Sequence, residues 1–165
     1  MQFLALLGLA ATAAAIDARL YYSQGCTGSG VQCGGLNPDT CCPAGGENFG
    51  SVEFRFIPLD WRIEGRGHNG GDCNGLRERG YPTNVDSICL SIGPFSGAGY
   101  GFRARKRGEA DYADCAKRDQ LFFEDGTIFN LADLDDDKVA ELIAIAAQAT
   151  NGTDIPAEFQ KLRIE

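Results

Sequence analysis

Apolar and polar residues alternate in several short segments in the middle of the chain. SVEFRFIPL places Val52, Phe54 and Phe56 on one side, and SICLSIG repeats the pattern. A period of two is typical of strands with one buried face. GYGFRARKR predicts another strand, and LFFEDGTIFNL predicts a hairpin because Asp125-Gly126 separates two apolar runs. Glycine-rich segments between these elements favour an antiparallel sheet or small sandwich.

The spacing changes near the C-terminus, where DLDDDKVAELIAIAAQATNG has apolar residues three and four positions apart. This period predicts an amphipathic helix near residues 134–150. Asp133 or Asp135 can cap its start, and Asn151-Gly152 can end it. The apolar stripe consists of Val139, Leu142, Ile143 and Ala146. The predicted fold class is therefore α+β: a small disulfide-tied antiparallel β sheet or sandwich with one C-terminal amphipathic helix packed on it.

The first residues have a different character. An apolar run from Phe3 ends in Ala13-Ala14-Ala15, which is typical of a secretory signal peptide. The run is shorter than the roughly 20 apolar residues that span a bilayer. We predict a signal peptide at 1–15, with cleavage after Ala15 or alternatively after Ala18, and a single secreted cysteine-rich domain at 16–165. No later segment resembles a membrane anchor, so we expect no stable one.

The cysteines all follow this segment: Cys26, Cys33, Cys41, Cys42, Cys73, Cys89 and Cys115. In an oxidising compartment such a set predicts a disulfide framework. Seven is an odd number, so at least one sulfur remains unpaired and could link two chains into a dimer. A zinc site usually needs closely spaced cysteine pairs and histidines. The spacing here differs and His68 is the one histidine, so we predict no metal and no cofactor.

The connectivity of these cysteines is open from sequence alone. Adjacent Cys41 and Cys42 are too close to bridge each other without strain. We expect Cys73 to pair with Cys115, because these residues flank predicted sheet segments, and Cys41 or Cys42 to reach Cys89. The unpaired thiol would then belong to the N-terminal group.

Charge is distributed unevenly along the chain. Residues 119–165 contain three basic and eleven acidic residues, which accounts for the whole net charge of −8. Nucleic acid is therefore not an expected partner, since phosphate binding needs a basic face. Lys106-Arg107 and Lys117-Arg118 are dibasic pairs that a secretory protease could cleave. Asn151-Gly152-Thr153 is an N-glycosylation sequon, which would make the protein a glycoprotein.

Catalytic motifs are not recognisable in this sequence. A Ser-His-Asp triad would have to use His68, which lies in a glycine-rich segment, and no G-x-S-x-G motif is present. We predict no catalytic residues and no enzyme activity.

QCGG at residues 32–35 resembles the opening of the fungal-type cellulose-binding module. YYSQGC at 21–26 resembles the aromatic stretch that closes that module, although here it precedes QCGG instead of following it. The Cys-Cys doublet is shared with hevein-like chitin-binding domains and with hydrophobins, although the other cysteine spacings differ. The short leader, seven cysteines and glycine-rich β region resemble fungal small secreted cysteine-rich proteins, many of them effector candidates. That resemblance implies an extracellular, non-enzymatic role.

We therefore expect a secreted interaction protein, effector-like or toxin-like, whose partner is an extracellular protein or a cell-wall polysaccharide. The alternative is a carbohydrate-binding module for chitin, cellulose or glucan, because exposed aromatic rings on a disulfide-tied sheet can stack on sugars. The candidate stacking residues are Tyr21, Tyr22, Trp61 and Tyr100.

Overall fold

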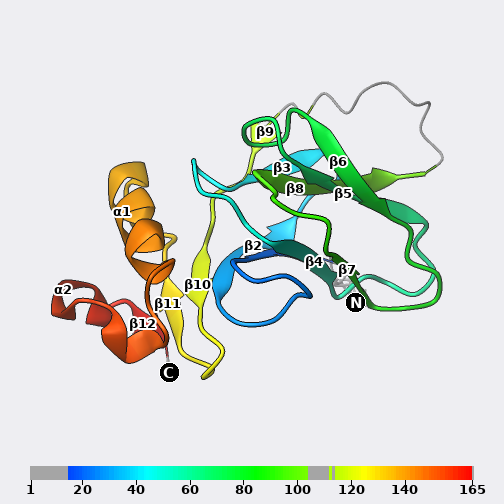
Figure 1. The fold of residues 1–165 in the computed structure, drawn as a ribbon. Coiled ribbons are helices and arrows are strands. Elements are labelled where there is room, and N and C mark those ends of the chain that lie inside the picture. Colours follow the sequence, from blue (N-terminus) through cyan, green and yellow to red (C-terminus); the bar gives the residue numbers. More distant parts are fainter. Residues whose placement is uncertain (1–14, 104–111, 113, 165) are drawn as a thin grey trace, which may run out of the picture.

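Two β-sheets and a helical C-terminal region build the fold, shown as a computed structural model in Figure 1. The structure describes residues 15–103, 112 and 114–164. The predicted signal peptide, apart from Ala15, and the Lys106-Arg107 pair lie outside these residues.

The described strands form a long sheet and a short sheet. The long sheet has the order β12-β11-β10-β2-β1-β4-β7, and the short sheet has the order β6-β5-β8-β3-β9. In chain order the strands are β1 (Ile16–Tyr21), β2 (Gly30–Leu36), β3 (Thr40–Pro43), β4 (Ser51–Arg55), β5 (Ile63–His68), β6 (Leu76–Gly80), β7 (Ser87–Leu90), β8 (Gly97–Phe102), β9 (Asp114–Cys115), β10 (Gln120–Phe122), β11 (Ile128–Asn130) and β12 (Arg163–Ile164). Neighbouring strands pair antiparallel, except that β3 and β9 are parallel. The predicted α+β fold class is confirmed.

The sheets pack face to face through their alternating apolar residues. Phe54 on β4 pairs with Ile88 on β7, and both side chains face the short sheet. Gly65 on β5 leaves room for them, because a Cβ atom there would lie 2.8 Å from the Phe54 ring and 2.9 Å from Ile88. The period-two pattern therefore placed these residues correctly in the core.

The alternation fails at Phe56, which follows β4. Its side chain is 58% exposed and its backbone has a φ of +60°. A left-handed backbone turns the chain out of the strand, so the third apolar residue of the pattern points to solvent instead of the core. Ile92 also departs from its pattern, because it lies beyond the end of β7, and its side chain is 62% exposed.

Helix α1 (Asp136–Ala146) covers the part of the long sheet that the short sheet leaves open, beside β10 and β11 (Figure 1). Asp135 caps it by accepting a hydrogen bond from the Lys138 amide at 2.9 Å. The predicted stripe of Val139, Leu142, Ile143 and Ala146 is buried. A 3-10 turn (Gly152–Asp154) and helix α2 (Ala157–Gln160) lead on to β12. No helix within the described residues is long and apolar enough to cross a membrane.

The predicted hairpin forms between β10 and β11. Its turn is closed by the hydrogen bond from the Gly126 amide to the Phe123 carbonyl, and Gly126 has a φ of +86°. Because β10 pairs with β2 on one side and β11 on the other, one continuous sheet joins the N-terminal strands to the C-terminal region.

Candidate functional site

The chain's one histidine belongs to a polar cluster on the outer face of the short sheet. Glu64, Arg66 and His68 alternate along β5 and therefore share a face. Their register partners on β8 are Gly101, Gly99 and Gly97. This run of glycines leaves room above β8 that larger side chains from other segments fill.

Arg66 lies at the centre of this cluster between two carboxylates. Its Nε donates to Glu64 Oε1 at 2.8 Å, and its Nη1 lies 3.5 Å from Asp39 Oδ1. Partial burial raises the pKa of Glu64, but hydrogen bonds from Arg66 and Tyr81 outweigh it and hold that pKa below its usual value. A Cβ atom at Gly101 would lie 2.6 Å from Asp39 Oδ1 and 2.9 Å from Arg66 Nη2, so a side chain there would displace this ion pair.

His68 is only 2% exposed, and its Nε2 lies 2.8 Å from the Tyr112 hydroxyl. Burial and the nearby charge of Arg66 lower the pKa of His68 to about 4, so the imidazole is neutral at physiological pH. Its Nδ1 is buried without a hydrogen-bond partner of good geometry among the described residues. Since the Tyr112 ring packs edge-on against the imidazole, any molecule approaching Nε2 would have to displace Tyr112.

The cluster therefore pairs its charges internally. Among the described residues no group of three His, Cys, Asp or Glu side chains could hold a metal ion. Separately, a hollow of about 510 Å³ lies beside the hairpin turn and is lined by Asp125, Gly126, Thr127, Gln160, Arg163 and Ile164. There, backbone and side-chain hydrogen bonds from Thr127 lower the pKa of Asp125 and fix its carboxylate within the turn.

The disulfides differ from the predicted connectivity. The bonds are Cys26–Cys89, Cys33–Cys42 and Cys41–Cys73. The predicted pairing of Cys73 with Cys115 is wrong, and so is the predicted link from Cys41 or Cys42 to Cys89. The free thiol is Cys115, which is exposed on β9 and does not belong to the N-terminal group.

The Cys41-Cys42 doublet explains this outcome, because successive residues of a strand point to opposite faces. Cys42 faces the interior of the sandwich and reaches Cys33 on β2, so this bond links the two sheets. Cys41 faces outward and reaches Cys73 in the loop between β5 and β6.

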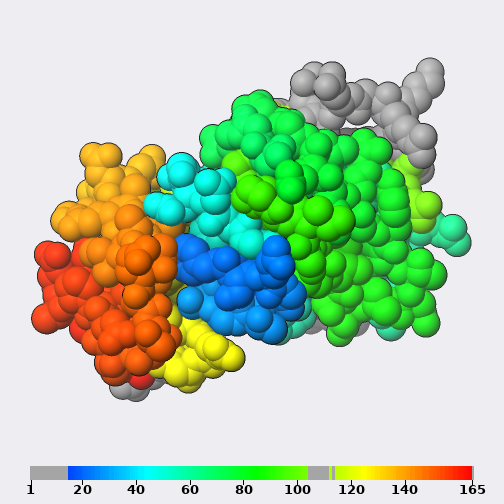
Figure 2. All heavy atoms as spheres, viewed as in Figure 1, coloured from blue at the N-terminus to red at the C-terminus, as the bar shows by residue number. Residues whose placement is uncertain are grey.

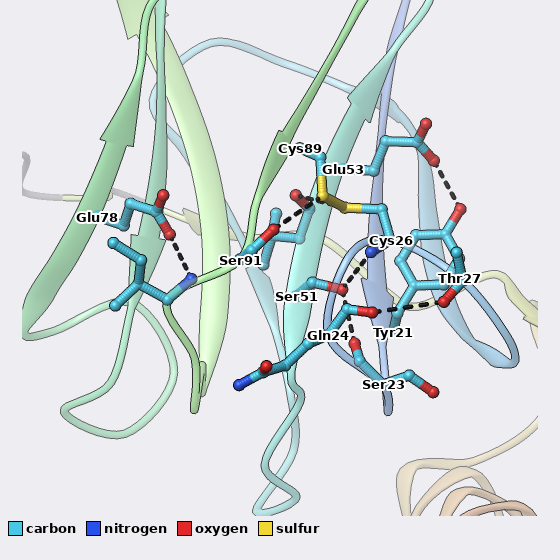
Figure 3. Close-up of a disulfide and its surroundings, with 12 residues drawn as sticks. Tyr21, Ser23, Gln24, Cys26, Thr27, Ser51, Glu53, Glu78, Cys89 and Ser91 are labelled. Atoms are coloured by element: carbon cyan, nitrogen blue, oxygen red, sulfur yellow. Dashed lines mark hydrogen bonds between the residues drawn. A yellow bond between two sulfur atoms is a disulfide. The ribbon is translucent and has the colours of Figure 1, made fainter.

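Cys26–Cys89 ties the loop between β1 and β2 across the outer face of the long sheet (Figure 3). The Ser51 hydroxyl holds this loop at two points. It accepts from the Cys26 amide at 2.8 Å and donates to the Ser23 carbonyl at 2.7 Å. The loop therefore crosses β4 to reach Cys89 on the edge strand β7.

The four aromatic residues predicted to stack on sugars do not form one platform. Tyr100 is 1% exposed and donates to the Leu36 carbonyl at 3.0 Å, and Tyr21 is 6% exposed, so neither ring is available for stacking. Tyr22 is half-buried against Phe49, and its hydroxyl donates to the Ile143 carbonyl of α1 at 2.9 Å. Trp61 is half-buried with its ring 5.0 Å from that of Phe102.

Asn151 is half-buried at the start of the 3-10 turn. Its Oδ1 accepts from the Thr153 amide at 2.9 Å, and Asp154 accepts from the Asn151 amide, which completes a capping box. The sequon therefore lies in an ordered turn, and its glycosylation stays a prediction. The dibasic Lys117-Arg118 pair is partly held in place, since Arg118 donates to the Ala44 carbonyl at 2.9 Å.

Apolar side chains gather at the end of the sandwich where β4 leads to β5 and β6 leads to β7. We call the loops 56–62 and 81–86 together the loop end. A hydrogen bond of 2.9 Å from the Ile57 amide to the Asp86 carbonyl joins them. The exposed large apolar residues here are Phe56, Leu59, Tyr81 and Val85. The alternation of apolar residues in β4 assigns Phe56 to the core, so the sequence pattern gives no sign of this surface.

Comparison with known proteins gives a family assignment. No curated protein and no solved structure matches the chain. Residues 17–119 match the model of the ARB_05566 N-terminal domain, and residues 124–165 match that of the ARB_05566 C-terminal domain. Strand β10 lies in the short stretch between the two matched regions. The chain belongs to the ARB_05566 family.

Proposed function

We propose that the protein is a secreted interaction protein, effector-like or toxin-like, that acts outside the cell without catalysing a reaction. The observation that carries this proposal is the disulfide framework. Its three bonds join segments 9, 32 and 63 residues apart. Such bonds form and persist in oxidising compartments and stabilise small exported domains.

The position of β1 favours signal cleavage after Ala15. Ile16–Tyr21 pairs with β2 on one side and with β4 on the other. Cleavage after Ala18 would remove the buried Ile16 and Ala18 from a central strand. The first site leaves the strand whole.

Expression of the full chain in a eukaryotic secretory host tests this proposal. We expect the protein in the medium, with Ile16 as its first residue and three disulfides by intact mass. A glycosidase treatment of the same sample reports whether Asn151 carries a glycan. Retention of the uncleaved chain inside the cell, with reduced cysteines, would contradict the proposal.

The alternative is binding to a cell-wall polysaccharide, and a row of polar side chains on the outer face of the long sheet favours it. Arg19 Nε donates to Gln32 Oε1 at 2.7 Å, and Gln32 Nε2 donates to Gln120 Oε1 at 3.3 Å. The Arg19 guanidinium also lies 4.5 Å from the centre of the Phe122 ring. Gln32 and Phe122 are only 5% exposed, so the Arg19 guanidinium and the Gln120 amide are the groups of this row that could hydrogen-bond sugar hydroxyls.

Sedimentation with insoluble chitin, cellulose and β-glucan separates the two candidates. If this row binds the polymer, Gln120→Ala should weaken retention, whereas Lys161→Ala on the exposed C-terminal surface should not. If both variants were retained equally, the polymer would bind to a surface other than this row of polar side chains.

A further inference from the structure

Three cysteines follow one another across the outer face of the short sheet. Strand β3 lies between β8 and β9, and its Cys41 faces outward and is bonded to Cys73. The Cys73 sulfur lies on the β8 side, because a Cβ atom at Gly97 would be 2.9 Å from it. Cys115 lies on the β9 side as the register partner of Cys41. The Cys41 side chain therefore lies between its present partner and a free thiol.

The placement of Cys115 beside Cys41 suits a disulfide. Neighbouring strands lie about 4.8 Å apart, which falls within the roughly 4.4–6.8 Å that separates the Cα atoms of bonded cysteines. The hydrogen bond of 2.7 Å from the Ala116 amide to the Cys41 carbonyl holds the two strands in this register. Register partners face the same side of a sheet. Cys115, which is exposed and free, can therefore reach Cys41 while both strands keep their positions.

The bond to Cys41 holds loop 69–75, which connects β5 to β6. Cys73 is 7% exposed and is the one buried residue of this loop. Beyond the loop's internal hydrogen bonds, the Ser96 hydroxyl donates to the Asp72 carbonyl at 2.9 Å. A loop with a single buried side chain depends on that side chain for its position. Loss of the bond at Cys73 would therefore release it.

We propose that Cys115 and the Cys41–Cys73 bond form a thiol–disulfide switch. The Cys115 thiol gives its proton to solvent, and the thiolate attacks the Cys41 sulfur from the β9 side. The Cys41–Cys73 bond breaks, its electron pair leaves with the Cys73 sulfur, and that sulfur takes up a proton. One disulfide and one thiol are present before and after the step, so it needs no oxidant or reductant. Loop 69–75 is then free and carries the thiol.

The surroundings of Cys115 keep the switch closed near neutral pH. Partial burial raises the pKa of its thiol, and the carboxylates of Asp72 and Asp114 raise it further. The thiolate is the attacking form of cysteine. The Cys41–Cys73 bond therefore persists until the thiol is deprotonated. This inference goes beyond the proposed function, because it does not depend on what the exported protein binds.

Incubation of the purified chain with intact disulfides, without reductant or alkylating agent, tests the step. Samples held near pH 6 and near pH 8 are quenched in acid, digested with pepsin and mapped by mass spectrometry. We expect a peptide pair linked through Cys41 and Cys115. It should form roughly a hundredfold faster at the higher pH, because the thiolate fraction rises about tenfold per pH unit below the thiol pKa. Excess iodoacetamide at neutral pH blocks Cys115 before the exchange and should prevent it.

Two variants test the geometry. Cys73→Ser removes the competing sulfur, so we expect a Cys41–Cys115 bond and no free thiol. Cys89→Ser is the matched control, because it also removes one partner of a disulfide. Cys26 and Cys115 should both remain free in that variant, since they lie on different sheets.

The released loop has its own signature. The Asn69 amide donates to the Gly75 carbonyl at 2.8 Å across the base of the loop, and its hydrogen exchange should become faster in Cys73→Ser. Helix α1 lies at the other end of the molecule from β5 and β6 (Figures 1 and 2), so its amides should keep their protection. Protection of α1 shows that the variant is folded.

The outcomes are distinct. Free thiols at both Cys41 and Cys115 in folded Cys73→Ser would overturn the inference. So would the absence of any peptide pair linked through Cys41 and Cys115 from the unmodified chain near pH 8, and this measurement decides if Cys73→Ser does not fold. Cys115→Ser should never release a thiol at Cys73 under the same conditions. A Cys73 thiol in Cys115→Ser would show that another group opens the bond.

Discussion

Cys115 on β9 is the register partner of Cys41 on β3, yet Cys41 is bonded to Cys73 and Cys115 keeps its thiol. Partial burial raises the pKa of the Cys115 thiol, and the nearby carboxylates of Asp72 and Asp114 raise it further. A thiolate is the reactive form of cysteine. The remaining free sulfur is therefore held in its less reactive state beside a disulfide.

We expect one alkylated cysteine, Cys115, when the folded protein is treated with iodoacetamide without reductant. The reaction should be slow at neutral pH and faster as pH rises, because the thiol pKa is raised. Peptide mapping identifies the site, and reduction should add about 6 Da for the three bonds. Alkylation of Cys73 or Cys89 in the unreduced protein would contradict the connectivity.

His68 makes stability depend on pH. Its pKa is about 4 in the folded protein, against 6.5 for an ordinary histidine. The unfolded chain therefore binds the extra proton first as pH falls, so stability is full above about 6.5 and declines between 6.5 and 4. Over this range the free energy of unfolding falls by at most about 3 kcal/mol.

Urea unfolding at a series of pH values measures this decline, and His68→Gln should flatten it. Glu64 lowers the free energy of unfolding only at more acidic pH. Its pKa is depressed in the folded protein, so the stability that its carboxylate contributes is lost when that carboxylate is protonated. The slope between pH 6.5 and 5 thus belongs to His68. An unchanged slope in His68→Gln would refute the assignment.

Gly99 decides whether Tyr112 can cover His68. A Cβ atom at this position would clash with the Tyr112 ring. Gly99→Ala should therefore displace the ring, admit water and raise the pKa of His68 toward 6.5, since burial is the first cause of its depression. NMR titration of the one imidazole measures this directly.

Tyr112→Phe is the matched comparison, because it deletes the hydroxyl 2.8 Å from Nε2 but keeps the ring in place. We expect the pKa of His68 to stay low in this variant. If Tyr112→Phe raised that pKa as far as Gly99→Ala did, the hydroxyl and not burial would be its main determinant.

Local patterns predicted the elements that depend on local physics. The stripe of α1 and the β10–β11 turn follow from neighbouring residues and were predicted, and Asp135, one of the two aspartates predicted as caps, caps the helix. Long-range features were missed. The disulfide partners depend on which strands become neighbours, and strand order is not encoded in any short segment.

The candidate sites show the same limit. In the sequence His68 lies in a glycine-rich segment, but the structure places it at the end of β5 beneath Tyr112, which is 44 residues further along the chain. The alternation of Phe56 with charged residues suggested burial, and only the left-handed backbone at that residue reverses it. Tertiary contacts and one backbone torsion angle overrode the local pattern.

In the sequence, the region through Cys42 has little apolar content of its own, which predicts that it depends on its bridges and that reduction loosens Tyr21 to Cys42 before the helix. The structure contradicts the premise that this region is poor in apolar contacts. Ile16, Leu20 and Val31 are fully buried, and Tyr22 bonds directly to α1.

We therefore expect reduction to act on a smaller unit, the loop 23–29 between β1 and β2. Cys26–Cys89 closes the longest of the three chain segments, and the loop has few buried side chains to replace it. Hydrogen exchange with and without reductant should show early loss of protection at the Cys26 amide, which donates to the Ser51 hydroxyl and belongs to no strand. The β1 amides should stay protected as long as those of α1, because that strand is paired on both sides.

Cys26→Ser with Cys89→Ser should reproduce this pattern without reductant. Early exchange throughout β1 in that variant would show that the bridge, and not strand pairing, holds the N-terminal strand in place.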